Sequence, residues 1–341
     1  MVNIRDIAKD AGVSITTVSH ALSNKRAVSN KTRERIFYSI EKLGYKPNAL
    51  ARSLKTKRTN TVGLIIPHKS KYFVENYTFI DLIPKLLENL IFNNYYLLIY
   101  KDYQDYNPIM SYEFLIKENR VDGFILVDPK HNDLRIQYLF KQKKPFVIFG
   151  RSPEYPDIPS VDVDNINGIF KATELLIRKG HKKIAYIGVS PNYIYAEDRL
   201  EGYKKALKQY NLPEDPQLIF LNPTYDENAG YWGIKNVYDH CRSITAVVCP
   251  SDQIAIGVIK GLKEKSIIIP DNVSVIGYDD SLLASYFYPP LSTVRQPIDT
   301  LSSLLVQEII NLVEQKNPKQ VQHHILETQL IERGTTKSLI N

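Results

Sequence analysis

The sequence "NIRDIAKDAGVSITTVSHALS" (residues 3–23) decides the fold of the N-terminal part of the chain. Asn3 is a suitable N-cap for a first helix, in which apolar residues recur at i, i+3, i+4 and i+7 from Ile4. Gly12 interrupts this helical pattern, and Ser14 can cap a second helix after a tight turn. The stretch therefore predicts two short helices that are joined by a turn.

The second helix is predicted to be amphipathic, and a third helix follows it. The residues expected to face inward on the second helix are Ile15, Val18 and Leu22. Those expected to face outward are Thr16, Thr17 and His20. Ser29 can cap the third helix, and Gly44 can end it. Three short helices with a tight turn between the first two are typical of a helix-turn-helix domain.

Short polar side chains on the second helix suit the reading of DNA bases. In a helix-turn-helix domain this helix enters the major groove and presents its N-terminal residues to base edges. Thr16 and Thr17 can hydrogen-bond to bases or contact a thymine methyl group, and His20 can donate to a guanine acceptor. Ser14 and Asn24 can contact phosphates and so set the position of the second helix along the DNA. The alternative interpretation is the ordinary polar face of a surface helix.

The net charge of the chain, +7, is concentrated near the N-terminus. Residues 1–60 contain 13 Lys and Arg residues and 4 Asp and Glu residues, a net charge of +9, whereas the other 281 residues contain 31 and 33, a net charge of −2. A basic N-terminal domain on a near-neutral body predicts binding to a polyanion, most simply double-stranded DNA. A solvated basic tail is the alternative, and the helical pattern argues against it.

The composition of the 341-residue chain argues against several classes of protein. With 43% hydrophobic and 24% charged residues it is typical of soluble globular proteins. Every apolar stretch is shorter than a membrane helix, and the N-terminus lacks the apolar core of a signal peptide, so we expect a cytoplasmic protein without a membrane partner. The two cysteines lack metal-site spacing, and nucleotide-binding and hydrolase motifs are missing, so no metal, cofactor or catalytic residue is predicted.

Residues 61–341 alternate between short apolar runs and amphipathic stretches. The apolar runs, which we predict as strands, are 61–67, 95–100, 121–127, 145–150, 182–188, 216–221, 244–249 and 272–277. The amphipathic stretches, which we predict as helices, lie near 76–92, 107–119, 131–142, 166–180, 197–210, 227–240 and 252–265. This alternation predicts parallel sheets covered by helices on both faces, and the length favours two α/β lobes.

Two α/β lobes side by side form a cleft at the carboxyl ends of their strands, where small ligands bind. Residues 251–253 (Ser-Asp-Gln) follow one predicted strand, Asp279 and Asp280 follow another, and Arg199 has a fixed site before a helix. Such polar and acidic groups, together with an arginine and an aromatic residue, can bind the hydroxyl groups of a sugar. The alternative is local structure, with Ser251 as a helix cap and the two aspartates in a turn.

Two long segments resemble a known family. "IRDIAKDAGVSITTVSHALSNKRAVSNKTRERI" followed by "LGYKPNALARSLKTKRTNTVGLIIP" resembles the start of a LacI/GalR-family transcriptional regulator over residues 3–67. Body segments such as "DRLEGYKKAL" and "YPPLSTVRQP" resemble the same family, whose core is similar to periplasmic sugar-binding proteins. The resemblance implies an all-α helix-turn-helix DNA-binding domain plus an α/β two-lobed, periplasmic-binding-protein-like (type I) effector domain.

The resemblance also implies domain boundaries. The parts are a helix-turn-helix domain over 1–46, a hinge helix and linker over 47–60, and an effector-binding and dimerisation domain over 61–341. Within the last, lobe N is expected over about 61–163 and 294–321, and lobe C over about 164–291 and 323–337.

By resemblance, Thr16, Thr17 and His20 read bases, Arg26 is a further base contact, and Ser14 faces phosphate.

The connector "PNALARSL" resembles the family's hinge helix, in which Leu54 enters the minor groove. Leu50 and Leu54 lie four apart, as neighbours on one helix face do, but a helix this short is unstable alone in water. A partner hinge and DNA would support it, with Arg52 and Lys55 on phosphates. Alternatively, the two leucines only pack on the body.

For the effector site, the resemblance implies a set of cleft residues: Arg199, Ser251, Asp279, Tyr225, Arg151, Gln296, Tyr72 and Phe73. Among these, Tyr225 occupies an aromatic position that can stack on a sugar face.

Three features qualify the resemblance. Ser266 stands where the family usually has Gly at a helix end, which is tolerable if Ser266 is not left-handed. The loop "HKSKYFVENYTF" (residues 68–79) is unlike its commonest form, so it does not identify the effector. No leucine heptads follow the core, so we expect a dimer and not a tetramer.

These features predict a cytoplasmic, homodimeric repressor of carbohydrate-utilisation genes, which is nucleoid-associated when bound to operator DNA. A monosaccharide or disaccharide in the cleft would rearrange the lobes, melt the hinge helices and release the DNA. In the alternative, a small molecule or a phosphocarrier protein acts as corepressor. An enzyme lacks its motifs here, and a sugar-transport component conflicts with the basic N-terminal domain.

Overall fold

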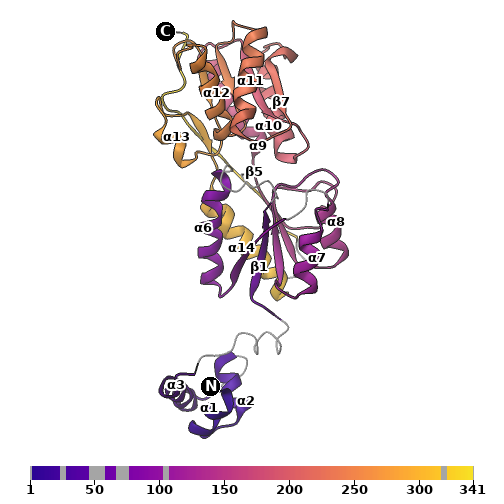
Figure 1. Cartoon of the computed structure of the whole chain (residues 1–341), viewed down its shortest axis with the longest axis vertical. Helices are drawn as coiled ribbons and strands as arrows, with labels where there is room; N and C mark the ends of the chain where they lie inside the picture. Colours follow the sequence, from indigo (N-terminus) through magenta and orange to yellow (C-terminus); the bar gives the residue numbers. More distant parts are fainter. Residues whose placement is uncertain are drawn as a thin grey trace. The chain divides into compact units, whose positions relative to one another are not determined.

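The computed structural model describes residues 2–23, 28–45, 58–66, 77–102, 107–315 and 321–340. The chain divides into two compact units, Met1–Thr59 and Asn60–Asn341, which are described separately below (Figure 1). The predictions for the hinge helix and for Leu54 lie outside the described residues. Within the described ranges, no helix combines the length and apolar character needed to cross a membrane.

The first unit contains the three predicted helices, α1 (Ile4–Asp10), α2 (Ile15–Ser23) and α3 (Asn30–Leu43). Asn3 caps α1 through a capping box with Asp6. Ser29 caps α3 by accepting a hydrogen bond from the amide of Thr32, and left-handed Gly44 ends the helix. The caps satisfy backbone groups that the helix ends leave unpaired, so helices this short can form.

The core of the first unit is small but fully buried at its centre, where Ile7, Val18 and Ile36 have no exposed surface. The prediction that Ile15 faces inward is wrong, because its side chain is 45% exposed. Ile15 is the first residue of α2 and lies at the edge of the core. The buried side of α2 is formed by residues one and two turns further along the helix.

The first lobe of the second unit is a six-stranded parallel sheet in the order β11-β5-β4-β3-β1-β2. Its strands are β1 (Thr61–Ile66), β2 (Tyr96–Lys101), β3 (Gly123–Leu126), β4 (Phe146–Phe149), β5 (Ser160–Val163) and β11 (His323–Leu326). Its helices are α6 (Tyr77–Phe92), α7 (Met110–Lys117), α8 (Leu134–Lys141) and α14 (Ile298–Glu314). Leu64 belongs to the core under α6 and α14, and the next residue, Ile65, to the core under α7 and α8.

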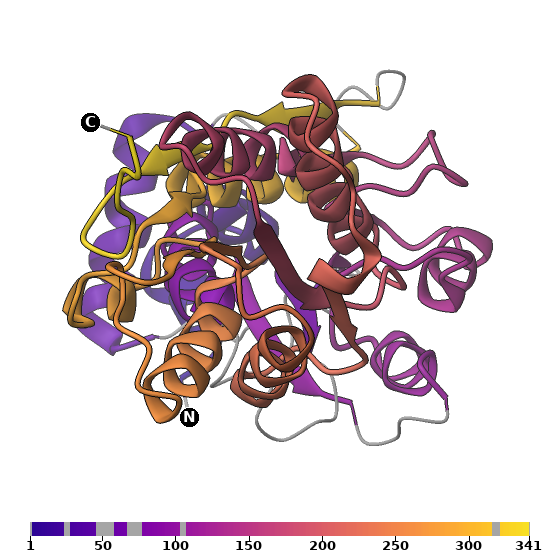
Figure 2. The same cartoon turned by 90° about the horizontal axis from the view of Figure 1, so that it is seen from above.

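The second lobe is a four-stranded parallel sheet in the order β7-β6-β8-β9. Its strands are β6 (Ile184–Val189), β7 (Ile219–Asn222), β8 (Ala246–Val248) and β9 (Ser274–Ile276). Its helices are α9 (Asn165–Arg178), α10 (Ile194–Gln209), α11 (Glu227–His240), α12 (Asp252–Glu264) and the short α13 (Leu282–Tyr286). In Figure 2 this sheet lies between α9 and α10 on one side and α11 and α12 on the other.

The described chain passes between the lobes at three places. It leaves the first sheet between β5 and α9, and returns between β10 (Thr293–Arg295) and α14. It leaves again between β11 and β12 (Gln329–Ile331), which pairs with β10. Strand β11 thus belongs to the first lobe, and the last passage follows Leu326, later than the predicted start at about residue 323.

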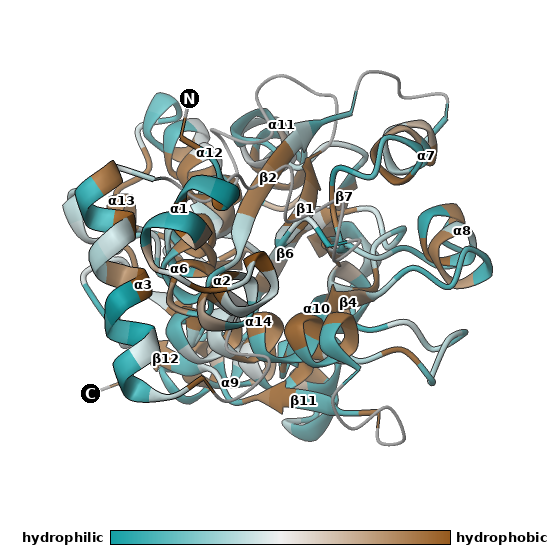
Figure 3. Cartoon of the chain, turned by 90° about the horizontal axis from the view of Figure 1, so that it is seen from below, coloured by the Kyte–Doolittle hydropathy of each residue, from teal (hydrophilic) through white to brown (hydrophobic). Residues whose placement is uncertain are grey.

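All eight predicted strands occur. One of them, β4, consists entirely of apolar residues and carries the hydrophobic colour in Figure 3. The sequence pattern missed β5, β10, β11 and β12, the strands next to the passages between lobes. Each of them is only three or four residues long.

Helices α11 and α12 pack unusually closely because glycine occurs at their contact. A Cβ atom at Gly257 would lie 1.9 Å from the carbonyl oxygen of Glu227, and one at Gly230 would lie 2.0 Å from that of Ile254. This contact holds the N-terminal half of α12 in place, where Ser251 and the next two residues are buried. Both glycines are therefore needed by packing.

Ser266 is left-handed, with a φ angle of 60°. Serine was expected to be tolerable at this helix end only if it was not left-handed, and this condition is not met. Its amide donates to the carbonyl of Lys263, and the next amide donates to the carbonyl of Leu262. This hydrogen-bond pattern is the one that favours glycine after a helix.

Candidate functional site

The outward face of α2 presents the polar residues that the sequence selects for DNA. Ser14 caps this helix by accepting from the amide of Thr17 at 3.0 Å, and the two hydroxyl oxygens lie 2.8 Å apart. Thr16 is exposed, while Thr17 and His20 are partly exposed. The other predicted DNA contacts lie outside the described residues: Asn24, Arg26, Arg52, Leu54 and Lys55.

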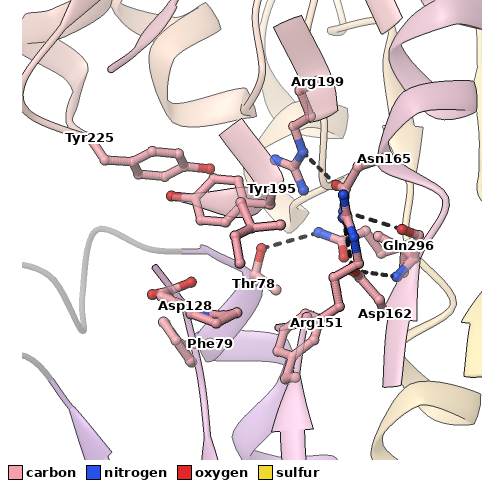
Figure 4. Close-up of a pocket in the computed structure, with 15 residues that line it drawn as sticks. Thr78, Phe79, Asp128, Arg151, Asp162, Asn165, Tyr195, Arg199, Tyr225 and Gln296 are labelled. Atoms are coloured by element: carbon pink, nitrogen blue, oxygen red, sulfur yellow. Dashed lines mark hydrogen bonds and ion pairs between the residues drawn. The ribbon is translucent and has the colours of Figure 1, made fainter. Parts of the chain in front are cut away.

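The second unit contains a pocket between its two lobes, with about 530 Å³ of space, part of which is open to solvent. The residues around it are Thr78, Phe79, Asp128, Pro129, Phe149, Gly150, Arg151, Asp162, Val163, Asn165, Ile194, Tyr195, Arg199, Tyr225 and Gln296. Figure 4 shows their side chains pointing toward a common space from both lobes. We call this space the interlobe pocket.

Arg199 of α10 is only 5% exposed, yet its guanidinium group reaches the interlobe pocket. Its Nε donates to the side-chain oxygen of Asn165 at 2.8 Å, and its Nη1 donates to the carbonyl of Pro250 at 2.5 Å. The guanidinium carbon lies 3.8 Å from the centre of the Tyr278 ring. These contacts hold the arginine in one orientation, as ligand recognition by its planar donors requires.

Asp279 lies behind the pocket in an unusual backbone conformation, with a φ angle of 115°. Its carboxylate is 3.9 Å from Arg199 Nη1 and accepts from the side-chain amide of Gln296 at 2.7 Å. Burial raises the pKa of Asp279 to about 6. The oxygen of the Gln296 amide is buried and finds no hydrogen-bond partner among the described residues. A buried acceptor without a partner calls for an explanation, and a donor group on a bound ligand would supply one.

Arg151 closes another side of the pocket through acidic partners. Its Nη2 donates to Asp198 at 2.7 Å, its Nη1 also contacts that carboxylate, and Asp162 lies 3.7 Å away. Burial raises the pKa of Asp162 to about 6. The carboxylate of Asp162 accepts from the side-chain amide of Asn165 at 3.1 Å. Because Asn165 also accepts from Arg199, this asparagine connects the two arginines.

Aromatic rings complete the pocket. Tyr195 and Tyr225 meet edge to face, with ring centres 6.1 Å apart. In Figure 4 these two rings lie together, across from Phe79 and Asp128. Flat rings facing carboxylates and arginine provide apolar and polar surfaces for one small ligand.

The structure brings four of the predicted effector residues to the pocket wall: Arg151, Arg199, Tyr225 and Gln296. Asp279 lies behind Arg199, and fully buried Ser251 caps α12 by accepting from the amide of Ile254 at 3.2 Å. Tyr72 and Phe73 lie outside the described residues.

Sequence reasoning missed Thr78, Asp128, Asp162, Asn165 and Tyr195. The signal for two of them was the polar sequence "DVDN" (residues 162–165), which joins a strand end to a helix start.

Two protein families match the chain. Residues 3–48 match "Bacterial regulatory proteins, lacI family", and residues 173–336 match "Periplasmic binding protein-like domain".

Curated relatives align over nearly the full length. The transcriptional regulator RegA of Clostridium saccharobutylicum is 35% identical, with 98% of this chain and 99% of that protein covered. The transcriptional repressor PurR of Histophilus somni is 33% identical, with 99% and 100% covered. The chain therefore belongs to the lacI family of bacterial regulatory proteins. It is a DNA-binding transcriptional regulator and not an enzyme.

Solved structures of the family share the fold. A complex of the transcriptional regulator CelR with cellobiose has a TM-score of 0.76 at 26% identity, covering 98% of this chain and 100% of that one. A LacI-family regulator from Enterococcus faecium with bound ribose has a TM-score of 0.70 at 27% identity, covering 82% and 99%.

Proposed function

We propose that this regulator is a homodimeric repressor of carbohydrate-utilisation genes, controlled by a monosaccharide or disaccharide in the interlobe pocket. It acts in the cytoplasm, at the nucleoid when bound to operator DNA. The observation that supports the effector most strongly is the buried Arg199, held by Asn165 and Pro250 at the wall of a pocket shared by both lobes.

The chemistry of the pocket favours a ligand with many hydroxyl groups. Arg199 supplies donors, Asp128 supplies acceptors, and the unpaired oxygen of Gln296 accepts one further hydroxyl. Tyr195 and Tyr225 offer ring surfaces for the apolar face of a sugar. The cellobiose and ribose in the two related structures belong to this chemical class.

DNA recognition is assigned to α2 and the connector. Thr16, Thr17 and His20 read bases in the major groove, while Ser14 contacts phosphate. Leu54 enters the minor groove between two hinge helices, and Arg52 and Lys55 contact the flanking phosphates. Asn24 and Arg26 extend the contact beyond the end of α2.

A homodimer is supported by apolar side chains that remain exposed on α6 and α13. On α6 they are Ile80, Leu87, Ile91 and Phe92, and around α13 they are Leu282, Tyr286 and Tyr288. Exposed apolar side chains that gather on one surface mark contact surfaces, whereas single ones are ordinary. We assign both groups to the contact with a second copy, which also places two DNA-binding domains on one operator.

A thermal-shift screen of the full chain against monosaccharides and disaccharides tests the proposal. A bound effector raises the melting temperature by mass action. We expect a concentration-dependent rise with at least one sugar, and none with Arg199→Ala. Arg178→Ala, which removes an exposed arginine of the same lobe, should respond like the wild type.

If no sugar shifts the wild type, or if Arg199→Ala responds normally, the effector assignment is wrong. For a sugar that does bind, its effect on operator affinity separates an inducer from a corepressor. An inducer lowers operator affinity, because it binds the DNA-free protein more tightly than the DNA-bound protein.

A further inference from the structure

A loop of the first lobe crosses to the start of α10 beside the interlobe pocket. Lys130 and Tyr193 form an isolated antiparallel bridge, and the amide of Ile194 donates to the carbonyl of Pro129 at 3.3 Å. The ammonium of Lys130 lies 4.9 Å from the centre of the Tyr193 ring. We call these contacts, together with those of His131, the interlobe latch.

His131 connects a carboxylate from each lobe. Its Nδ1 lies 3.3 Å from Glu154 of the first lobe, and its Nε2 lies 2.8 Å from Glu197 on α10. An ionised carboxylate only accepts hydrogen bonds, so both ring nitrogens have to donate. Only the protonated imidazolium form of histidine donates from both nitrogens. The geometry of the latch therefore requires His131 to be charged.

The charged surroundings of His131 agree with this state. The hydrogen bonds to Glu197 and Glu154 raise the pKa of His131 above its ordinary value. Glu154 also accepts from the hydroxyl of Ser152 at 3.1 Å, which fixes it in place. The two nearby cations have other partners, since Lys130 lies over the Tyr193 ring and Arg151 is paired with Asp198.

One residue of the latch, Glu197, lies on the same stretch of α10 as two pocket residues. Tyr195 and Arg199 line the interlobe pocket, while Glu197 lies between them in sequence and turns outward to His131. Separating the lobes would take Glu197 away from His131 and leave only Glu154 beside the ring. The closed pocket therefore binds the proton of His131 more tightly than an open pocket does.

We propose that His131 is a positioning residue for effector binding, which as an imidazolium ion holds the Tyr195–Arg199 turn of the second lobe against the first lobe. The inference rests on the proposed effector site, because it assigns regulation to that same pocket. Closure is favoured at low pH and weakens as the pH rises through the pKa of His131. Since the ion pairs are partly exposed, we expect an effect of about two- to fivefold.

Hydrogen exchange of the unliganded full chain tests the latch without any effector. The readout is the protection of peptides covering residues 190–200, which contain the interlobe amide of Ile194, at pH 6 and pH 8 after correction for intrinsic exchange. We expect wild-type protection to be about two- to fivefold higher at pH 6. His131→Gln and Glu197→Gln should abolish this difference, and His240→Gln, which changes an exposed histidine on α11, should keep it.

Equal wild-type protection at both pH values, or an unchanged difference in His131→Gln, would overturn the proposal. Failure of the proposed function would appear separately, as the absence of a melting-temperature shift of the wild type with every monosaccharide and disaccharide of the screen. The exchange experiment decides the latch in either case, because it contains no ligand.

Discussion

At the residue scale, the interlobe pocket depends on a few buried polar groups that hold one another. Asn165 accepts from Arg199 and donates to Asp162, so a single amide fixes an arginine and a carboxylate. Its position was not predicted, because asparagine at the start of a helix is also an ordinary capping residue. Arg199 and Asp279 were predicted from motifs, and they lie 3.9 Å apart in the structure.

A second buried carboxylate, Asp252, leads to a prediction about pH. It accepts from the hydroxyl of Thr293 at 2.6 Å and from the amide of Ser281 at 2.7 Å. Burial raises the pKa of Asp252 to about 8, from its usual value of 3.8. Between pH 3.8 and about pH 8, Asp252 is protonated in the folded state, whereas in the unfolded chain it has lost its proton. Stability therefore falls as the pH rises through this window.

Asp252→Asn should remove this contribution. Between pH 6 and pH 8, the free energy of unfolding of the wild type should fall relative to that of the variant, by up to about 1.4 kcal/mol per pH unit. Chemical denaturation at several pH values measures the free energy of unfolding of both proteins. Asp157→Asn, at an exposed site, is the matched control and should run parallel to the wild type. Parallel curves for Asp252→Asn would contradict the role of burial.

At the element scale, caps and helix ends determine where site residues lie. Ser251 was a candidate both as an effector contact and as a helix cap, and the structure shows that it caps α12. A sequence pattern cannot separate these roles, because capping and ligand binding use the same short polar side chains. The close contact of Gly230 with α12 was likewise invisible, since it depends on which helices pack together.

The left-handed Ser266 gives a prediction for the C-terminal end of α12. Ser266→Gly should stabilise the second unit by about 0.5–1 kcal/mol, because glycine adopts this conformation without the steric cost of a side chain. Thermal unfolding measures the change. Ser303→Gly, at an exposed position inside α14, should instead destabilise it. A lower melting temperature for Ser266→Gly would show that the serine side chain has another role.

At the scale of the whole molecule, the sequence predicted the division into a helix-turn-helix unit and a two-lobed α/β unit. Periodic apolar residues identified the helices of the first unit and the central strands of both sheets. The passages between lobes were less predictable, because β5, β10, β11 and β12 beside them are only three or four residues long. The pocket was predicted only in part, since Asp128, Tyr195 and Asn165 meet through tertiary packing from both lobes.

The central claim is that a ligand in the interlobe pocket controls the DNA-binding domain of the same chain. Such coupling requires differential binding of the ligand to the DNA-bound and free states. An operator fragment, selected from genomic DNA by the purified protein, provides the readout when its fluorescence anisotropy is titrated with the full chain.

The most direct measurement is that titration, performed with and without the sugar found in the thermal-shift screen, for the wild type and for Arg199→Ala. We predict that the sugar changes the operator affinity of the wild type by at least about fivefold, the lower end of typical allosteric coupling. Arg199→Ala should bind the operator as the wild type does without sugar, and should not respond to sugar. An equal response in both proteins, or no response in the wild type, would contradict the account.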